Sequence, residues 1–181
     1  MEKHPGIARR HGPIVHSMLT DSTLREAFSH FPQGVVLVAA EIDGVPHGLV
    51  ASTFTVGVSL DPPLVALAVQ HSSQTWPLLA ERPGLGVSLL GRDQSGVARQ
   101  LASTNRERRF AGVGVEVDGT GALTLEDAPA TMTTQIYATT AAGDHDMVLL
   151  EVLTIDSVPG AHAMVFHRSA FKELSAKDLP A

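Results

Sequence analysis

The sequence contains no cysteine among its 181 residues. This excludes disulfides, thiolate metal sites and a cysteine nucleophile, and it predicts a reducing compartment, most simply the cytoplasm. Long apolar runs are absent as well. No run approaches the ~20 residues that cross a bilayer, and residues 1–16 lack the continuous apolar stretch of an export signal. We therefore expect a soluble cytoplasmic protein with no membrane partner.

Positive charge is scarce too. The chain has 13 Lys and Arg against 19 Asp and Glu, a formal net charge of −6, and no basic block. Nucleic acid is therefore not an expected partner. The motifs G-x-S-x-G, H-E-x-x-H and G-x-G-x-x-G are all missing, and the nine histidines are scattered. The sequence predicts neither a hydrolase triad, nor a metal site, nor a Rossmann nucleotide site.

What the chain does contain is a series of short segments rich in valine and alanine, separated by Gly, Asp and Pro. These segments predict strands at 34–41, 46–58, 64–69, 84–90, 113–117, 130–140, 147–157 and 163–167. Helix signals predict short helices at 23–31, opened by a capping box at Thr23, and at 72–82 and 93–102. Most connections between strands are too short for a helical crossover, so we expect an antiparallel β-barrel with peripheral helices.

The domain organisation follows from the same signals. Residues 1–20 carry Pro and Gly without periodicity and are expected to form a flexible arm. Residues 21–174 are expected to form one domain, and residues 175–181 a C-terminal tail.

Small hydroxyl residues gather in two places. Ser52 and Thr53 lie in a strand-like run that ends at Pro62-Pro63, and Ser73 and Thr75 open a predicted short helix. Hydroxyls at a helix N-terminus suit a phosphate group. Ordinary capping of the helix by Ser73 or Thr75 is the alternative, and a strand ending in a rigid turn is the alternative for the first group.

A second candidate is the tetrapeptide Gly143-Asp144-His145-Asp146, between two predicted strands. A histidine beside carboxylates at a strand end is either a catalytic group or a loop residue with its own hydrogen bonds. The tetrapeptide alone leaves both interpretations open.

From about Leu24 to Leu174 the chain resembles the flavin reductases of two-component monooxygenase systems, which have the flavin-reductase-like, FMN-binding split-barrel domain. The resemblance is carried by the order and spacing of five segments: Phe31-Pro32-Gln33-Gly34-Val35; Ala51-Ser52-Thr53-Phe54 with Val58-Ser59-Leu60-Asp61-Pro62-Pro63-Leu64-Val65; Ser73-Gln74-Thr75-Trp76; Arg109-Phe110-Ala111-Gly112-Val113; and Gly143-Asp144-His145.

The resemblance implies a mainly β fold, an antiparallel split β-barrel of Greek-key type with a few short peripheral helices. It also implies a homodimer that binds FMN or FAD, takes hydride from NADH or NADPH, and supplies free reduced flavin to a partner monooxygenase. A flavin-binding module that reduces nothing, or an enzyme with a fixed flavin, is the alternative, because such barrels also carry other functions.

The resemblance further implies roles for individual residues. His145 is the expected catalytic residue, beside the nicotinamide, and no metal ligand is expected. The expected cofactor-binding residues are Gly34, Val35, Ala51, Ser52 and Thr53 along the isoalloxazine and ribityl chain, Ser73 and Thr75 at the phosphate, Arg109 and Phe110 bordering the flavin, and Ser59. Two positions depart from the family: Ser88, where asparagine is common, and Leu150, where glycine is usual. These departures are expected to alter a hydrogen bond near the cofactor and to fill space against a strand.

Overall fold

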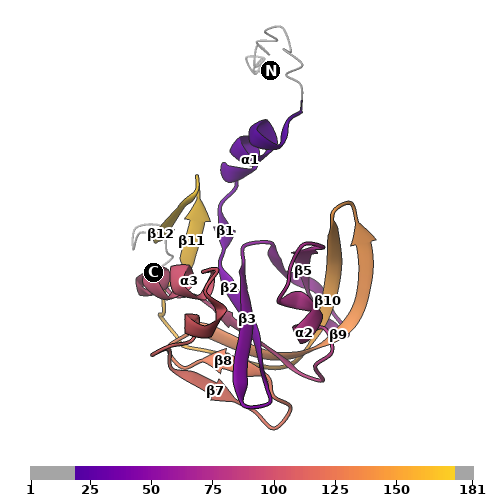
Figure 1. Ribbon diagram of the computed structural model, residues 1–181, viewed down its shortest axis with the longest axis vertical. Coiled ribbons are helices and arrows are strands. Elements are labelled where there is room, and N and C mark those ends of the chain that lie inside the picture. The colour runs from indigo at the N-terminus through magenta and orange to yellow at the C-terminus, as the bar shows by residue number, and fades with distance from the viewer. Residues whose placement is uncertain (1–18, 174–181) are drawn as a thin grey trace, which may run out of the picture.

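The computed structural model describes residues 19–173 (Figure 1). The expected arm at 1–20 lies almost entirely outside the described residues, as does the expected tail at 175–181. The strands are β1 (Gln33–Gly34), β2 (Val36–Ile42), β3 (Val45–Ala51), β4 (Phe54–Leu60), β5 (Pro63–Gln70), β6 (Leu85–Leu89), β7 (Val115–Val117), β8 (Leu123–Leu125), β9 (Ala130–Ala142), β10 (His145–Ser157), β11 (Met164–His167) and β12 (Ala170–Glu173). The helices are α1 (Asp21–Ser29), α2 (Trp76–Leu79) and α3 (Ser95–Leu101), with 3₁₀ turns η1 (Arg92–Gln94) and η2 (Arg106–Arg108).

Seven strands form the main sheet in the order β3-β2-β6-β9-β10-β5-β4, and every pairing in it is antiparallel. Its two outermost strands, β3 and β4, are joined by Ser52 and Thr53 alone. A sheet whose two edges are connected by two residues must curve back on itself, which Figure 1 shows. The expected mainly β, antiparallel barrel with short peripheral helices is confirmed.

The expected single strand at 46–58 is wrong in one respect, because it is two strands. Ala51 at the end of β3 pairs with Val36, whereas Phe54 at the start of β4 pairs with Leu67. The chain therefore changes partner strand between residues 51 and 54. No proline or Asn-Gly turn marks this change in the sequence, and β-branched residues on both sides of it favour a strand equally.

The helix expected to begin at Thr23 begins earlier. Thr20 is its N-cap: its Oγ1 accepts from the Thr23 backbone N–H at 3.3 Å, and the Thr20 N–H donates to Thr23 Oγ1 at 2.9 Å. Thr23 therefore fills the third helical position of a capping box, where Glu or Gln is usual. Along residues 19–173, no helix is long and apolar enough to cross a membrane.

Two core clusters lie on opposite faces of β2, because alternate residues of a strand point to opposite sides. Inside the barrel, Val38 packs with Leu67 and Leu150 and with Trp76 of α2. On the outer face, Leu37 packs under α3 and the β7–β8 hairpin with the second group of buried residues, which are Val35, Ala39, Leu90, Ala98, Leu101, Leu123, Leu125, Ala128 and Met164. The barrel interior is thus filled by side chains, which leaves ligand sites to its outer surface and its rim.

The two departures from the family pattern both lie in this packing. Ser88 is fully buried, and its Oγ accepts from the Leu125 backbone N–H at 2.9 Å, so it joins β6 to β8. The expectation that it alters a hydrogen bond near the cofactor stays a prediction. Leu150 is also fully buried and fills the barrel interior, as expected from its size.

Candidate functional site

The side chain of Arg109 joins three segments of the chain. Its Nη1 donates to the Gly48 carbonyl at 3.1 Å and to Thr75 Oγ1 at 3.3 Å, and its Nε donates to the Ser103 carbonyl at 2.7 Å. Gly48 lies in β3 and Thr75 at the start of α2. The structure therefore brings together Arg109 and Thr75, which were expected to share a site.

The loop that carries Arg109 is held by one side chain. Gln100 Nε2 donates to the carbonyls of Arg108, Arg109 and Ala111, at 3.2, 3.1 and 2.8 Å. Nothing in the sequence indicates this role, because it depends on the loop folding back onto α3. Gln100 therefore holds the loop of the candidate site, and the sequence analysis did not identify it.

Gly48 is a second residue of the candidate site that the sequence analysis did not identify. It is buried, and a Cβ there would lie 2.9 Å from Phe110 Cζ and 2.9 Å from Leu37 Cδ1. Only glycine lets the Phe110 ring pack this closely on β3. A glycine inside a predicted strand often marks a close approach of other atoms, and this is the signal that could have identified Gly48.

Arg109, Thr75 and Phe110 border a cavity of about 150 Å³. Its remaining walls are Val45, Pro46, His47, Gly48, Leu78, Arg106 and Glu107. The cavity is thus lined by apolar residues together with two arginines, a glutamate, a histidine and the threonine hydroxyl.

The positive charge at this cavity is not compensated. Burial, followed by the nearby charge of Arg106, lowers the pKa of the Arg109 guanidinium, which still remains charged at neutral pH. Arg106 donates to Gln74 Oε1, a neutral group. Within residues 19–173, neither arginine forms an ion pair with a carboxylate, although Glu107 lines the same cavity. Two close cations and a threonine hydroxyl are the donor set that a flavin phosphate requires.

The structure separates the two interpretations of the hydroxyls before α2. Ser73 Oγ accepts from the Trp76 backbone N–H at 3.1 Å, so Ser73 caps the helix. Thr75 is buried, makes no capping bond and instead accepts from Arg109. The capping alternative therefore holds for Ser73 but not for Thr75.

Thr53 and His145 lie on one face of the sheet. Thr53 Oγ1 donates to the Ala68 carbonyl at 2.7 Å, and the Ala68 N–H donates back to the Thr53 carbonyl at 3.3 Å. Two residues along β5, Gln70 pairs with His145 of β10. Paired residues share a face, as do residues two apart, so Thr53 and His145 are same-face neighbours roughly 12 Å apart, from two strand spacings and two residue rises.

His145 is held by its neighbour Asp144. Nδ1 of His145 donates to Asp144 Oδ1 at 2.7 Å, and the histidine side chain is 27% exposed. This hydrogen bond, followed by the charge of His145, holds the pKa of the Asp144 carboxyl below its usual range. With Nδ1 bonded to the carboxylate, Nε2 is the ring nitrogen left to meet a ligand.

The remaining predicted residues lie around the join between β3 and β4. Ala51 packs partly against the barrel core, Ser52 is half-buried and Thr53 is exposed. Because Ala51 pairs with Val36, Gly34 and Val35 lie at this same end of the hairpin. Gly34 is exposed, whereas the Val35 side chain is buried in the outer core cluster.

Ser59 lies apart from both the cavity at Arg109 and the residues around Thr53. It lies near the far end of β4, paired with Leu64, and its Oγ accepts from the Asp61 backbone N–H at 3.3 Å. Its partner Leu64 lies four residues along β5 from Ala68, to which Thr53 is bonded, and this corresponds to roughly 13 Å. Its assignment as a cofactor-binding residue stays a prediction.

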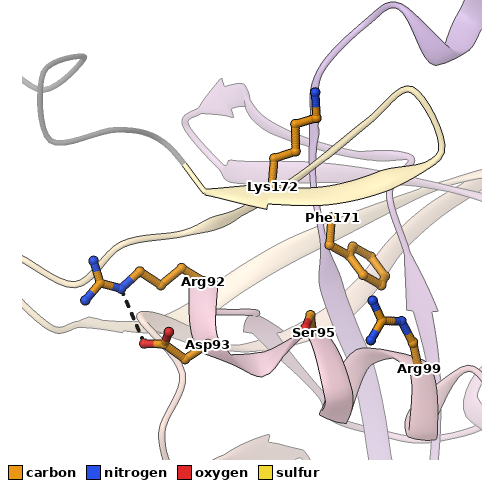
Figure 2. Close-up of a pocket in the computed structure, with 6 residues that line it drawn as sticks. All are labelled: Arg92, Asp93, Ser95, Arg99, Phe171 and Lys172. Carbon is orange, nitrogen blue, oxygen red and sulfur yellow. Dashed lines mark hydrogen bonds and ion pairs between the residues drawn. The ribbon is translucent and has the colours of Figure 1, made fainter.

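A second cavity, of about 510 Å³, lies elsewhere, between η1, α3 and β12 (Figure 2). Arg92 pairs there with Asp93 at 3.3 Å, and Arg99 lies 5.5 Å from the centre of the Phe171 ring. Figure 2 shows Lys172 extending from the opposite side of β12, away from both arginines. None of the predicted site residues lines this cavity.

The chain matches the family described as "Flavin reductase like domain" over residues 28–175. The match covers most of the chain, so the protein belongs to the flavin-reductase-like family. The landmark segments lie within the matched range.

Three relatives illustrate the similarity. The chain is 33% identical over 153 residues to the NADH:riboflavin 5'-phosphate oxidoreductase of Streptomyces pristinaespiralis, covering 82% of this chain and 85% of that protein. The structure is similar to the NADH:FAD oxidoreductase of Streptomyces globisporus C-1027, solved with NAD and FAD fragments, with a TM-score of 0.80, 30% identity and coverage of 88% and 98%. It is also similar to BorF, the flavin reductase component of a bacterial two-component tryptophan halogenase, with a TM-score of 0.78, 33% identity and coverage of 86% and 98%.

Proposed function

We propose that the protein is an NAD(P)H-dependent flavin reductase acting on FMN or FAD. The observation that carries the proposal is the uncompensated Arg109, bonded to Thr75 at the cavity beside β3. A bound flavin supplies the redox chemistry, because it accepts hydride directly from a reduced nicotinamide. The protein then needs no nucleophile, which agrees with the absence of cysteine and of a hydrolase motif.

The protein groups act by holding and orienting. Arg109 and Thr75 hold the phosphate, with the Ser73 hydroxyl two residues before Thr75. The Ser52 hydroxyl and backbone N–H groups at 51–53 donate to the ring system and ribityl chain, whereas the Thr53 hydroxyl already donates to the Ala68 carbonyl. His145, fixed by Asp144, presents Nε2 on the same sheet face as Thr53 and orients the nicotinamide. Holding two rings in contact is the main contribution that a protein makes to direct hydride transfer.

The alternatives, a flavin-binding module or an enzyme with a fixed flavin, differ from a reductase in turnover. The test is steady-state oxidation of NADH and NADPH with FMN or FAD in large excess over the protein. A flavin reductase consumes many equivalents of nicotinamide and bleaches the added flavin under anaerobic conditions. Flavin binding without nicotinamide oxidation identifies a binding module, and a yellow protein that does not exchange its flavin identifies a fixed cofactor.

The free reduced flavin is proposed to serve a partner monooxygenase. Support comes from a relative in Thermus thermophilus, 29% identical over 150 residues, which is the reductase component of 4-hydroxyphenylacetate 3-monooxygenase. A flavin-dependent oxygenase separated from the reductase by a dialysis membrane tests this proposal. Product formation across the membrane shows that the flavin itself is the carrier, and its absence, with reductase turnover intact, argues against release.

We also propose a homodimer, because two strands expose apolar side chains. Val56, Val58 and Leu60 are exposed on the edge strand β4, and Leu153 and Ile155 are exposed on β10. An exposed apolar edge strand is normally covered by a partner. Light scattering after gel filtration should give twice the chain mass, and Leu60→Glu should shift it toward the monomer. A cytoplasmic location stays a prediction from the sequence.

A further inference from the structure

A second histidine–aspartate pair lies beside His145. His71, the first residue after β5, donates from Nε2 to Asp146 Oδ1 at 3.1 Å. Its backbone N–H also donates to the Asp144 carbonyl at 3.0 Å. His71 therefore contacts both residues that flank His145 in the sequence.

The Asp146 side chain lies on the other face of the strand from His145. Asp146 pairs with Val69, and Val69 and Val148 are both buried in the barrel core. Successive residues of a strand point to opposite faces, so Asp146 lies on the inner side at the rim of the barrel. The hydrogen bond between His71 and Asp146 therefore holds β10 on its inner face, whereas the His145 ring lies on the outer face.

His71 also lies in the turn between the two parts of the candidate site, the strand beside His145 and the helix start at Thr75. The Ser73 N–H donates to the Gln70 carbonyl at 2.9 Å, and Gln70 pairs with His145. The turn from Gln70 to Ser73 thus runs directly from the strand beside His145 to the phosphate side at Thr75. A side chain anchored at His71 fixes the spacing between these two parts.

We infer that His71 and Asp146 are positioning residues for His145, which orient its ring toward the nicotinamide without contacting substrate. The inference rests on the proposed function and extends it to two residues outside the flavin and nicotinamide contacts. The side chains of His71 and Asp146 are 48% and 32% exposed, so the pair is partly solvated and its effect is moderate.

The kinetic test compares His71→Ala, Asp146→Asn and the double variant with wild type. We expect each single variant to lose about fivefold in kcat/KM for NADH, with the Kd for FMN changed less than twofold. The double variant should lose no more than either single variant, because both changes break one interaction. His71→Gln should recover most of the loss, since its amide nitrogen reaches the position of Nε2.

Asp156→Asn is the matched control, because it makes the same charge change at the far end of β10. The inference is overturned if Asp146→Asn behaves like Asp156→Asn, if the two single losses add, or if His71→Gln is as impaired as His71→Ala.

A readout independent of turnover keeps the inference separate from the proposed function. The ring nitrogens of His145 are followed by NMR in ¹⁵N-histidine-labelled protein. Their resonances should move in His71→Ala and Asp146→Asn, return in His71→Gln and stay in place in Asp156→Asn. If wild type fails to oxidise NADH, the proposed function is wrong and this measurement alone decides the positioning role. Unchanged resonances in both variants overturn it.

Discussion

Arg109→Gln is the most direct test of the phosphate site. The substitution removes the one charged donor that contacts Thr75 at the cavity, while keeping a polar side chain of moderate length. Hydrogen bonds to charged groups contribute roughly 1.5–3 kcal/mol, and we take about 2 kcal/mol for the arginine–phosphate contact. Since 1.4 kcal/mol is tenfold, FMN should bind about thirtyfold more weakly. Arg109→Lys keeps the charge but loses the fork of donors, and it should lie between wild type and Arg109→Gln.

The assay compares FMN with riboflavin, which has the same ring but no phosphate. Fluorescence quenching should show a large loss for FMN in Arg109→Gln and almost none for riboflavin. Raising the ionic strength should weaken FMN binding to wild type more than to the variant, because salt screens the lost charge. The control is Arg108→Gln, the neighbouring exposed arginine.

Arg109 also supports the loop, so folding must be checked separately. Its bonds to the carbonyls of Gly48 and Ser103 contribute on the order of 1 kcal/mol each to the free energy of unfolding. Urea denaturation identifies conditions under which the variant is fully folded. If riboflavin and FMN lose affinity equally there, or if Arg108→Gln loses as much, Arg109 does not hold the phosphate.

Three further predictions concern catalysis, packing and pH. His145→Ala should lower kcat/KM for NADH about tenfold with the FMN Kd nearly unchanged, measured by steady-state kinetics and flavin titration; equal losses in both contradict its role. Gly86→Ala should lower the free energy of unfolding, measured in urea, by about 3 kcal/mol, because the added Cβ would lie 1.9 Å from the Leu123 carbonyl oxygen. Gly96→Ala in α3, where the added Cβ meets open space, should raise the free energy of unfolding by about 0.8 kcal/mol. Partial desolvation raises the pKa of Asp118, but hydrogen bonds, first from Thr120, outweigh this and lower it. The contribution of Asp118 to stability is therefore present above about pH 4, the pKa of the carboxyl in the unfolded chain, and is lost as the pH falls through the lower pKa of the folded state. When the pH is lowered from 7 to 3, the urea midpoint should therefore fall less steeply for Asp118→Asn than for wild type.

Local signals predicted most of the elements. The turn at Asp43-Gly44 separates β2 from β3 as expected, and both residues have positive φ, of 52° and 77°. Strands as short as β8 and β12, with three and four residues, were missed.

Some residues of the candidate site could be predicted from the sequence and others could not. The resemblance indicated Thr75, Arg109 and His145, and the structure gives each a defined hydrogen-bond partner. Gln100 and His71 could not be found from sequence, because their roles depend on which loops and strands lie next to each other.

The connection at Ser52 and Thr53 has a consequence for protein handling. A ligand that contacts both β3 and β4 binds the native arrangement of these strands better than one in which they have separated. At a concentration of a hundred times its Kd, such a ligand stabilises the native arrangement by about 2.7 kcal/mol. Without a bound ligand, β3 and β4 would separate more often, and their outer edges, which pair with no strand among residues 19–173, would become more accessible to further chains. Keeping flavin in purification buffers should therefore slow precipitation on storage.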